Sequence, residues 1–236
     1  MEIANTHTFV RGLVKEIGDT LVTRKKEAID YRAGERLEAE LQEGFIKKLR
    51  GKFPDHGVIG EGNISIDKKL NSDYIWVMDI LDGTKNFVSG KTEYGTSVTL
   101  LHKRNPVLNL YYAPEHKANG ADCCWFETNE DAEGAYLNAQ KMNLLECFHF
   151  VGRKGATEFR KRGKIGLYAP RTSLRECIGG IYTLLKTGGI VTDLNGDKVI
   201  PISESILNSR EAIMPAIIAT TSENDVQYFV KLLRRK

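Results

Sequence analysis

Two aspartates three residues apart, Asp79 and Asp82, are the residues of this chain best suited to chemistry. They follow an apolar run, 74–78, whose length is typical of a buried strand, and they precede Gly83 and Thr84. The end of a strand can carry both carboxylates to one opening at the edge of a sheet. Glycine permits a tight turn, after which the amides of Gly83 and Thr84 can hold phosphate oxygens. The segment therefore predicts a site for a cation and a phosphate.

A third carboxylate, Glu61, lies upstream between Gly60 and Gly62, a setting that favours an exposed and sharply turned backbone. Hard carboxylate ligands with open positions suit Mg²⁺, which keeps waters and takes phosphate oxygens as ligands. With Asp79 and Asp82, this residue could hold two metal ions, which activate a water and stabilise a leaving oxygen. A plainer interpretation is an ordinary turn or helix N-cap, with Glu61 on the solvated surface.

Helical and strand patterns alternate along the chain and must position these side chains. The stretch from Val10 to Arg50 is helical in pattern, with an apolar face that contains Leu37, Leu41, Phe45 and Leu49. Further helices are expected at 176–186 and 223–235, and strands at 57–60, 74–78, 97–101, 106–112, 123–128, 135–137, 190–193 and 216–220. This order predicts an α/β or α+β layered fold.

Composition limits the possible functions. The chain has 236 residues, 41% hydrophobic and 28% charged, with a net charge of +3, which argues against a dedicated nucleic-acid binder. It contains no apolar run long enough to cross a bilayer and no signal peptide, so we expect a cytoplasmic protein with no membrane partner. The four cysteines are expected to be unpaired. Without repeats or linkers, we expect one domain, 1–236.

Residues 76–87, Trp-Val-Met-Asp-Ile-Leu-Asp-Gly-Thr-Lys-Asn-Phe, resemble the first signature of the inositol monophosphatase family. The segments 53–61, 97–114 and 134–138 are similar to the flanking segments of that family, so the resemblance extends from about residue 50 to 142. It implies an αβαβα sandwich with a metal and phosphate lobe, about 1–142, and a smaller substrate lobe, 143–236. It also implies a lithium-sensitive phosphatase with two or three Mg²⁺ ions, a small phosphorylated substrate and a homodimer.

The resemblance assigns roles to individual residues. Glu61 binds the first metal ion and orients the attacking water, Asp79 bridges the metal ions, and the carbonyl of Leu81 adds a ligand. Asp82 binds the second ion, and the hydroxyl of Thr84 contacts the water. The catalytic residues are thus Glu61, Asp79 and Thr84, and water attacks phosphorus directly without a phosphoenzyme. The amides of Gly83 and Thr84, in the turn that follows Asp82, bind the phosphate.

The sequence departs from the family pattern around the second signature, a Trp-Asp pair that opens a helix. Arg175 and Glu176 stand at those positions, so Glu176 is the candidate metal ligand there. Ile80 replaces the proline of the first signature, and Gly62 replaces a second acidic residue. For a third metal site near the N-terminus the spacing offers only Glu38 or Asp30.

The segment between Leu145 and Arg175 is shorter than in typical members of the family. We expect it to lack a helix and the strand pair that follows it, and a basic stretch, 153–164, stands in their place. That stretch is a solvated loop or a binding site for a second substrate phosphate.

Several functions stay open at this level. The first is hydrolysis of inositol monophosphate or a related sugar phosphate. Relatives in the family also act on fructose 1,6-bisphosphate, 3′(2′),5′-bisphosphate nucleotides and histidinol phosphate. The alternative is a degenerate, non-catalytic member that binds a metal ion or a protein partner, since the aspartate of the second signature and part of the substrate lobe are absent.

Overall fold

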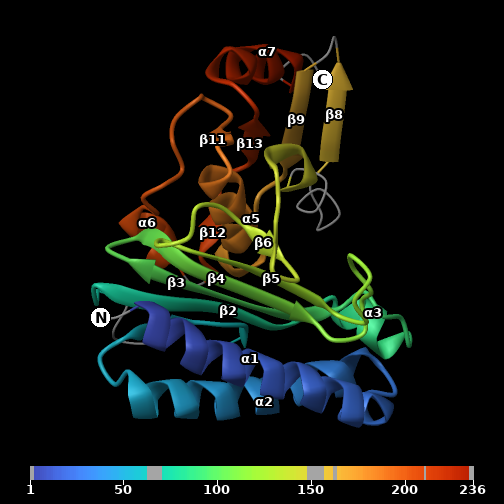
Figure 1. Ribbon diagram of the computed structural model, residues 1–236. Coiled ribbons are helices and arrows are strands. Elements are labelled where there is room, and N and C mark those ends of the chain that lie inside the picture. Colours follow the sequence, from blue (N-terminus) through green and yellow to red (C-terminus); the bar gives the residue numbers. More distant parts are fainter. Residues whose placement is uncertain (1–2, 63–70, 148–156, 162–163, 210, 234–236) are drawn as a thin grey trace.

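Helix layers and sheet layers alternate in this protein (Figure 1). The computed structural model describes residues 3–62, 71–147, 157–161, 164–209 and 211–233. The first layer holds α1 (Ile3–Arg24) and α2 (Tyr31–Lys52), and a seven-stranded sheet covers it. Helix α5 (Leu174–Lys186) separates that sheet from a four-stranded sheet, which α7 (Glu223–Leu233) covers. The predicted αβαβα order is confirmed, while the lobe boundary near residue 142 stays a prediction.

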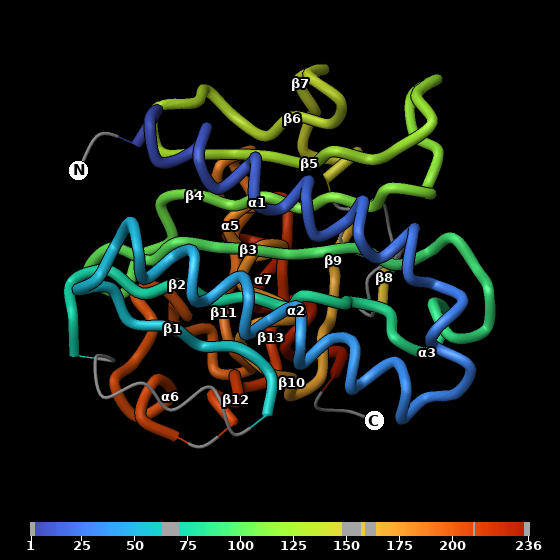
Figure 2. Tube along the Cα trace, turned by 90° about the horizontal axis from the view of Figure 1, so that it is seen from below, coloured from blue at the N-terminus to red at the C-terminus, as the bar shows by residue number. Residues whose placement is uncertain are grey.

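The seven-stranded sheet carries the segment with the two aspartates. Its strands follow one another in chain order; β1 pairs with β2 in parallel, and all later pairs are antiparallel. The helices α1 and α2 lie across one face of this sheet (Figure 2). The strands are β1 (Gly57–Ile59), β2 (Tyr74–Asp82), β3 (Gly95–His102), β4 (Asn105–Ala113), β5 (Cys124–Asn129), β6 (Tyr136–Leu137) and β7 (Gln140–Lys141).

The second sheet corrects an expectation about the segment after Leu145. Its order is β11 (Ile190–Asp193), β13 (Ile217–Thr220), β9 (Lys164–Ala169) and β8 (Thr157–Lys161). The strand pair expected to be lacking is therefore present as β8 and β9. Strand β8 lies at the edge of this sheet, where charged residues are common. Such residues interrupt the alternation of apolar and polar residues by which a strand is predicted. Part of the basic stretch, 153–156 and 162–163, lies outside the described residues.

Short elements complete the fold. Strand β10 (Thr172–Ser173) leads into α5 and pairs with β12 (Ile213–Met214). Helix α3 (Thr84–Val88) follows β2, α6 (Glu204–Leu207) precedes β12, and a 3₁₀ turn occupies Lys25–Glu27. No helix in the described part of the chain is long and apolar enough to cross a membrane. The four cysteines are free, as predicted.

The helical stretch near the N-terminus consists of two helices. Asp30 caps α2: its side chain accepts a hydrogen bond from the amide of Ala33 at 2.7 Å. Such a cap satisfies one of the four amides that the first turn leaves without a partner. Asp30, one of two candidates for a third metal site, is therefore used as a cap.

Apolar side chains hold β2 between the layers. Trp76 and Met78 pack in the core shared with α1 and α2, whereas Ile75 and Val77 pack on the opposite face with α5 and the second sheet. Alternate residues of a strand point to opposite faces, so a strand covered on both sides is apolar throughout. This burial fixes the strand whose end carries Asp79 and Asp82.

The contact between α5 and the first sheet depends on a glycine. A Cβ at Gly179 would lie 2.5 Å from Oδ1 of Asn109, which is 2% exposed and accepts a hydrogen bond from the Thr99 hydroxyl at 3.0 Å. We expect Gly179→Ala to lower the free energy of unfolding by about 1–3 kcal/mol because it overpacks this contact.

Urea unfolding of Gly179→Ala and the control Gly44→Ala measures the effect. Gly44 lies in α2 with nothing within 4 Å of an added Cβ, so its substitution should raise stability by up to about 1 kcal/mol. Equal effects of the two substitutions would contradict close packing of α5 on β4.

Candidate metal site

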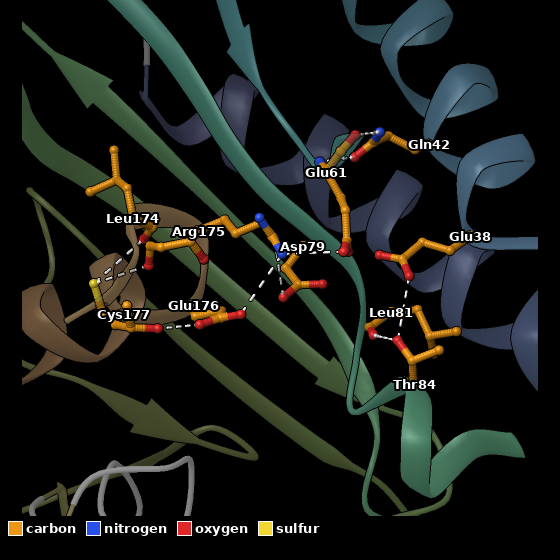
Figure 3. A network of polar contacts seen from close by, with 12 residues as sticks. Glu38, Gln42, Glu61, Asp79, Leu81, Thr84, Leu174, Arg175, Glu176 and Cys177 are labelled. Atoms are coloured by element: carbon orange, nitrogen blue, oxygen red, sulfur yellow. Dashed lines mark hydrogen bonds and ion pairs between the residues drawn. The ribbon is translucent and has the colours of Figure 1, made fainter. Parts of the chain in front are cut away.

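Three carboxylates from separate parts of the chain meet at the end of β2. Glu38 of α2, Glu61 after β1 and Asp79 of β2 each offer one oxygen, and these atoms lie within 4.8 Å of one another. Figure 3 shows the three side chains converging. Among the described residues they form the one acidic group with this spacing. The sequence predicted Glu61 and Asp79 here, and offered Glu38 only by spacing.

An irregularity in β2 brings Asp79 and Asp82 to the same side of the sheet. Residues three apart on a regular strand point to opposite faces. The register of β2 against β3 shifts between these two aspartates, and the intervening Ile80 and Leu81 both pack in the core below the sheet. A bulge of this kind realigns the following side chains. Consequently both aspartates line one cavity.

Gln42, one helical turn after Glu38, fixes the backbone of the third carboxylate. Its Oε1 accepts from the amide of Glu61 at 2.7 Å, and its Nε2 donates to the carbonyl of Glu61 at 2.9 Å. Gly60 lets the chain approach, because a Cβ there would clash with the Gln42 amide. Gln42 was not predicted from the sequence, although two polar residues four apart on the buried face of one helix, Glu38 and Gln42, are a usable signal.

Burial makes the carboxylates difficult to ionise without a cation. Glu38 is 4% exposed and Asp79 is 5% exposed. Loss of hydration, the Glu61 carboxyl group and the charge of Asp79 raise the pKa of Glu38 to about 9. Loss of hydration and the charge of Asp82 raise the pKa of Asp79 to about 7, although Arg175 opposes this.

Two oxygens of the group are buried without a hydrogen-bond partner in the described structure, Oε1 of Glu38 and Oδ1 of Asp79. Buried polar atoms are nearly always paired, so two neighbouring carboxyl oxygens without a partner indicate a missing ligand. Three hard oxygen donors facing one another suit a hard divalent cation such as Mg²⁺. The donor set therefore fits the metal predicted from the sequence.

The turn after β2 places a hydroxyl beside this group. Thr84 Oγ1 lies 3.0 Å from the carbonyl oxygen of Leu81 and 3.4 Å from Oε2 of Glu38, and both are acceptors for its proton. Gly83 has φ of +92°, and a Cβ there would lie 2.8 Å from the carbonyl oxygen of Glu93. Only glycine fits this turn without strain, as its place after Asp82 predicted.

A cavity of about 330 Å³ adjoins the carboxylates, between the end of β2, the start of α5 and the second sheet. Glu61 shares it with Asp79 and Asp82, which was the main requirement of the sequence-based hypothesis. The other polar or turn residues in its lining include Tyr31, Gly83, Thr84, Arg171, Thr172, Arg175 and Glu176. The site thus has room for a small molecule next to its acidic residues.

Glu176 lies at the side of this cavity, outside the three-carboxylate group. Its side chain is 46% exposed, and one carboxylate oxygen accepts a hydrogen bond from the Thr172 hydroxyl. Its assignment as a metal ligand stays a prediction, as do those of Leu81 and Asp82.

Arg175 is a second site residue whose role was not predicted from the sequence. The family resemblance leads us to expect a tryptophan at this position, whereas here a guanidinium points at the carboxylates (Figure 3). Nη2 lies 3.3 Å from Oε1 of Glu61, and Nε lies 3.9 Å from Oδ2 of Asp79. The helix that carries it was predicted, but its direction of approach to β2 is a tertiary property.

Comparison with curated proteins finds phosphatases and their relatives. The chain is 37% identical over 159 residues to the bifunctional phosphatase IMPL2 of Arabidopsis thaliana, a match that covers 62% of this chain and 43% of that protein. It is 33% identical over 141 residues to Nus factor SuhB of Pasteurella multocida, covering 60% and 49%. Thus the chain spans about half the length of these relatives. A fructose-1,6-bisphosphatase/inositol-1-monophosphatase of Thermotoga maritima is 23% identical over 221 residues, covering 79% and 81%.

Solved structures share the fold. An inositol monophosphatase from Thermotoga maritima superposes with a TM-score of 0.68 at 16% identity, covering 98% of both chains. Inositol monophosphatase II of Staphylococcus aureus gives a TM-score of 0.66 at 16% identity and covers 96% of this chain and 95% of its own.

The family comparison agrees with the geometry. The sequence model of the inositol monophosphatase family matches residues 12–166, which include all three converging carboxylates and the turn at Gly83. With more than half of the chain matched and the layers in the same order, this chain belongs to the inositol monophosphatase family.

Proposed function

We propose that this protein is a Mg²⁺-dependent phosphatase that hydrolyses a small phosphate monoester, inositol monophosphate or a related sugar phosphate. The observation that carries the proposal is the pair of buried, unpartnered carboxylate oxygens of Glu38 and Asp79 beside Glu61. Such a pair is costly in any protein that does not bind a cation there. The adjoining cavity supplies room for a substrate of this size.

Glu38, Glu61 and Asp79 would hold the ion, and Asp82 would extend the ligand set from the same cavity. Mg²⁺ at this site would supply positive charge to the phosphoryl oxygens and lower the pKa of a water. Two or three ions are proposed from the family resemblance, together with sensitivity to Li⁺.

The remaining chemistry belongs to residues of the chain. Glu61 and the Thr84 hydroxyl orient a water for in-line attack on phosphorus, and the amides of Gly83 and Thr84 hold the phosphoryl oxygens. A P–O bond to the water forms as the P–O bond to the ester oxygen breaks, and phosphate and an alcohol are released. The hydrogen bond available between Thr84 and Glu38 ties this hydroxyl to the acidic group.

The substrate stays open among related phosphate esters. One relative is named a fructose-1,6-bisphosphatase/inositol-1-monophosphatase, and another, from Haemophilus influenzae, a 3′(2′),5′-bisphosphate nucleotidase that is 36% identical over 72 residues. Histidinol phosphate is a further candidate from the family resemblance. A second function, binding without turnover, is favoured by one observation: Arg175 puts a positive charge on two of the carboxylates that a metal ion needs.

Release of phosphate from small esters tests the proposal. We expect the wild-type protein with Mg²⁺ to release phosphate in a malachite-green assay, and Li⁺ to suppress the release. Asp79→Asn should reduce the rate by about 100-fold or more while the far-ultraviolet circular dichroism stays unchanged, because it removes charge at the site rather than core packing.

The matched control is Asp122→Asn, an aspartate whose side chain is 94% exposed and pairs with Lys117 on the surface. It should leave the rate within about twofold of wild type, as expected of an exposed ion pair. No release from any ester by a protein that still binds Mg²⁺ would favour the binding function instead.

The raised pKa values predict how stability depends on pH without metal. Glu38 keeps its proton in the folded chain up to about pH 9, against 4.5 for an ordinary glutamate, and Asp79 keeps its proton up to about pH 7, against 3.8. The folded state binds these protons more tightly than the unfolded state, so their stabilising contribution is complete below the ordinary values. It is lost as pH rises towards the folded values.

In EDTA, the free energy of unfolding measured with urea should therefore fall between pH 5 and pH 9, and Glu38→Gln should flatten the fall. Mg²⁺ should also flatten it, because it stabilises the ionised form. A pH dependence that is unaltered in Glu38→Gln would show that this side chain is solvated.

A further inference from the structure

A guanidinium group lies inside the acidic site, next to the carboxylate oxygens that we propose bind a metal ion. Arg175, in the first turn of α5, is 20% exposed in its side chain. Nη2 lies 3.3 Å from Oε1 of Glu61 and 3.8 Å from Oε1 of Glu176, and Nε lies 3.9 Å from Oδ2 of Asp79. Its positive charge therefore faces two of the three carboxylates that converge at the end of β2.

The contacts are electrostatic but not well formed as hydrogen bonds. An arginine that pairs tightly with a carboxylate makes two parallel bonds at 2.7–2.9 Å. Here the distances are 3.3 Å to Glu61 and 3.9 Å to Asp79, and Nε is buried without a hydrogen-bond partner in the described structure. Because these contacts are long, the guanidinium gives up no well-formed hydrogen bond to Glu61 or Asp79 when it moves away.

The charge of Arg175 is permanent, since the group does not lose its proton at any pH relevant to a protein. It lowers the cost of ionising Asp79, which a divalent ion would also do. Arginine and ion thus stabilise the same anionic oxygens, and a bound ion repels the guanidinium at close range. Both cannot satisfy Glu61 and Asp79 fully at once.

We infer that Arg175 is a resident cation of this site and competes with a divalent metal ion for Glu61 and Asp79. The inference rests on the proposed function, because it requires that a metal ion binds between these carboxylates. Metal binding displaces the guanidinium from Glu61 and Asp79. Arg175 thereby raises the metal concentration at which the site fills, and it keeps the carboxylates compensated when the ion is absent.

A purely structural ion pair would behave differently. In that case removal of Arg175 would loosen the site and weaken metal binding. Competition predicts the opposite sign: removal of the charge tightens metal binding and destabilises the metal-free protein. The sign of the change in metal affinity therefore separates the two roles.

Titration with Mn²⁺, followed by electron paramagnetic resonance of the free ion, measures this sign. We expect Arg175→Met to lower the Kd for Mn²⁺ by about tenfold or more, the scale of one charge pair at this distance in a partly buried site. Arg175→Lys keeps the charge and should lie nearer to wild type. Arg171→Met is the matched control: Arg171 lines the same cavity, but Arg175 is the residue paired with Glu61 and Asp79. Its Kd should stay within about twofold of wild type.

An unchanged or higher Kd for Arg175→Met would overturn the inference, and so would equal tightening by the Arg171 control. Urea unfolding adds a readout that does not depend on activity: Arg175→Met should be less stable than wild type in EDTA and should regain stability with Mn²⁺. If this variant does not fold in EDTA, folding rescued by Mn²⁺ supports competition, whereas failure to be rescued contradicts it.

The outcomes also separate this inference from the proposed function. If wild type and Arg175→Met bind Mn²⁺ equally well and the wild-type enzyme is active, the competition is rejected and the phosphatase proposal is supported. Tighter Mn²⁺ binding by Arg175→Met in a protein that hydrolyses no ester would support the competition and reject the phosphatase.

Discussion

Two carboxylates buried side by side, those of Glu38 and Asp79, are the constraint on which this site depends. Removing such groups from water is costly, and placing them next to one another adds repulsion. The fold tolerates them because apolar packing anchors the elements that carry them. Helix α2 is held by its face of Leu37, Leu41 and Phe45, and β2 by side chains on both of its faces. Core packing thus stabilises an arrangement that the site alone would oppose.

Polar contacts and backbone geometry then determine where each carboxylate points. Gln42 fixes both backbone groups of Glu61, so a residue outside regular structure acquires a defined position. On a regular strand Asp79 and Asp82 would point to opposite faces, but the bulge between them places both side chains on one face. Gly83 closes the turn in a conformation that residues with a Cβ rarely adopt. Each of these features acts on the backbone and thereby sets the direction in which the side chains converge.

The start of α5 is where the chemistry of this chain departs from the pattern that the family resemblance predicts. Arg175 and Glu176 stand where that resemblance leads us to expect a tryptophan and an aspartate. The helix itself is retained and packs closely on β4 through Gly179. A guanidinium introduced at such a position cannot avoid the carboxylates opposite, because the helix is held close to the sheet. Arg175 therefore brings a permanent positive charge to the site.

The sequence alone determined the segments that bear function and most of their secondary structure. The strand before Asp79, the glycine turn after Asp82 and the glycines around Glu61 are local patterns, readable because strand length, turn chemistry and spacing are encoded over a few residues. A layered α/β or α+β fold also followed, because helical and apolar alternations are local signals, whereas the αβαβα order came from the family resemblance. The pair β8 and β9 did not follow, since charged residues at the edge of a sheet obscure the alternation of the strand.

Only the tertiary structure decided which polar groups share one space. Glu38 and Asp30 were both candidates for a third metal site, yet one joins the carboxylates and the other caps α2. Gln42 and Arg175 acquire their roles from contacts with residues far away in sequence. Distances between separate elements depend on how the layers pack, and no periodicity within a single segment contains that information.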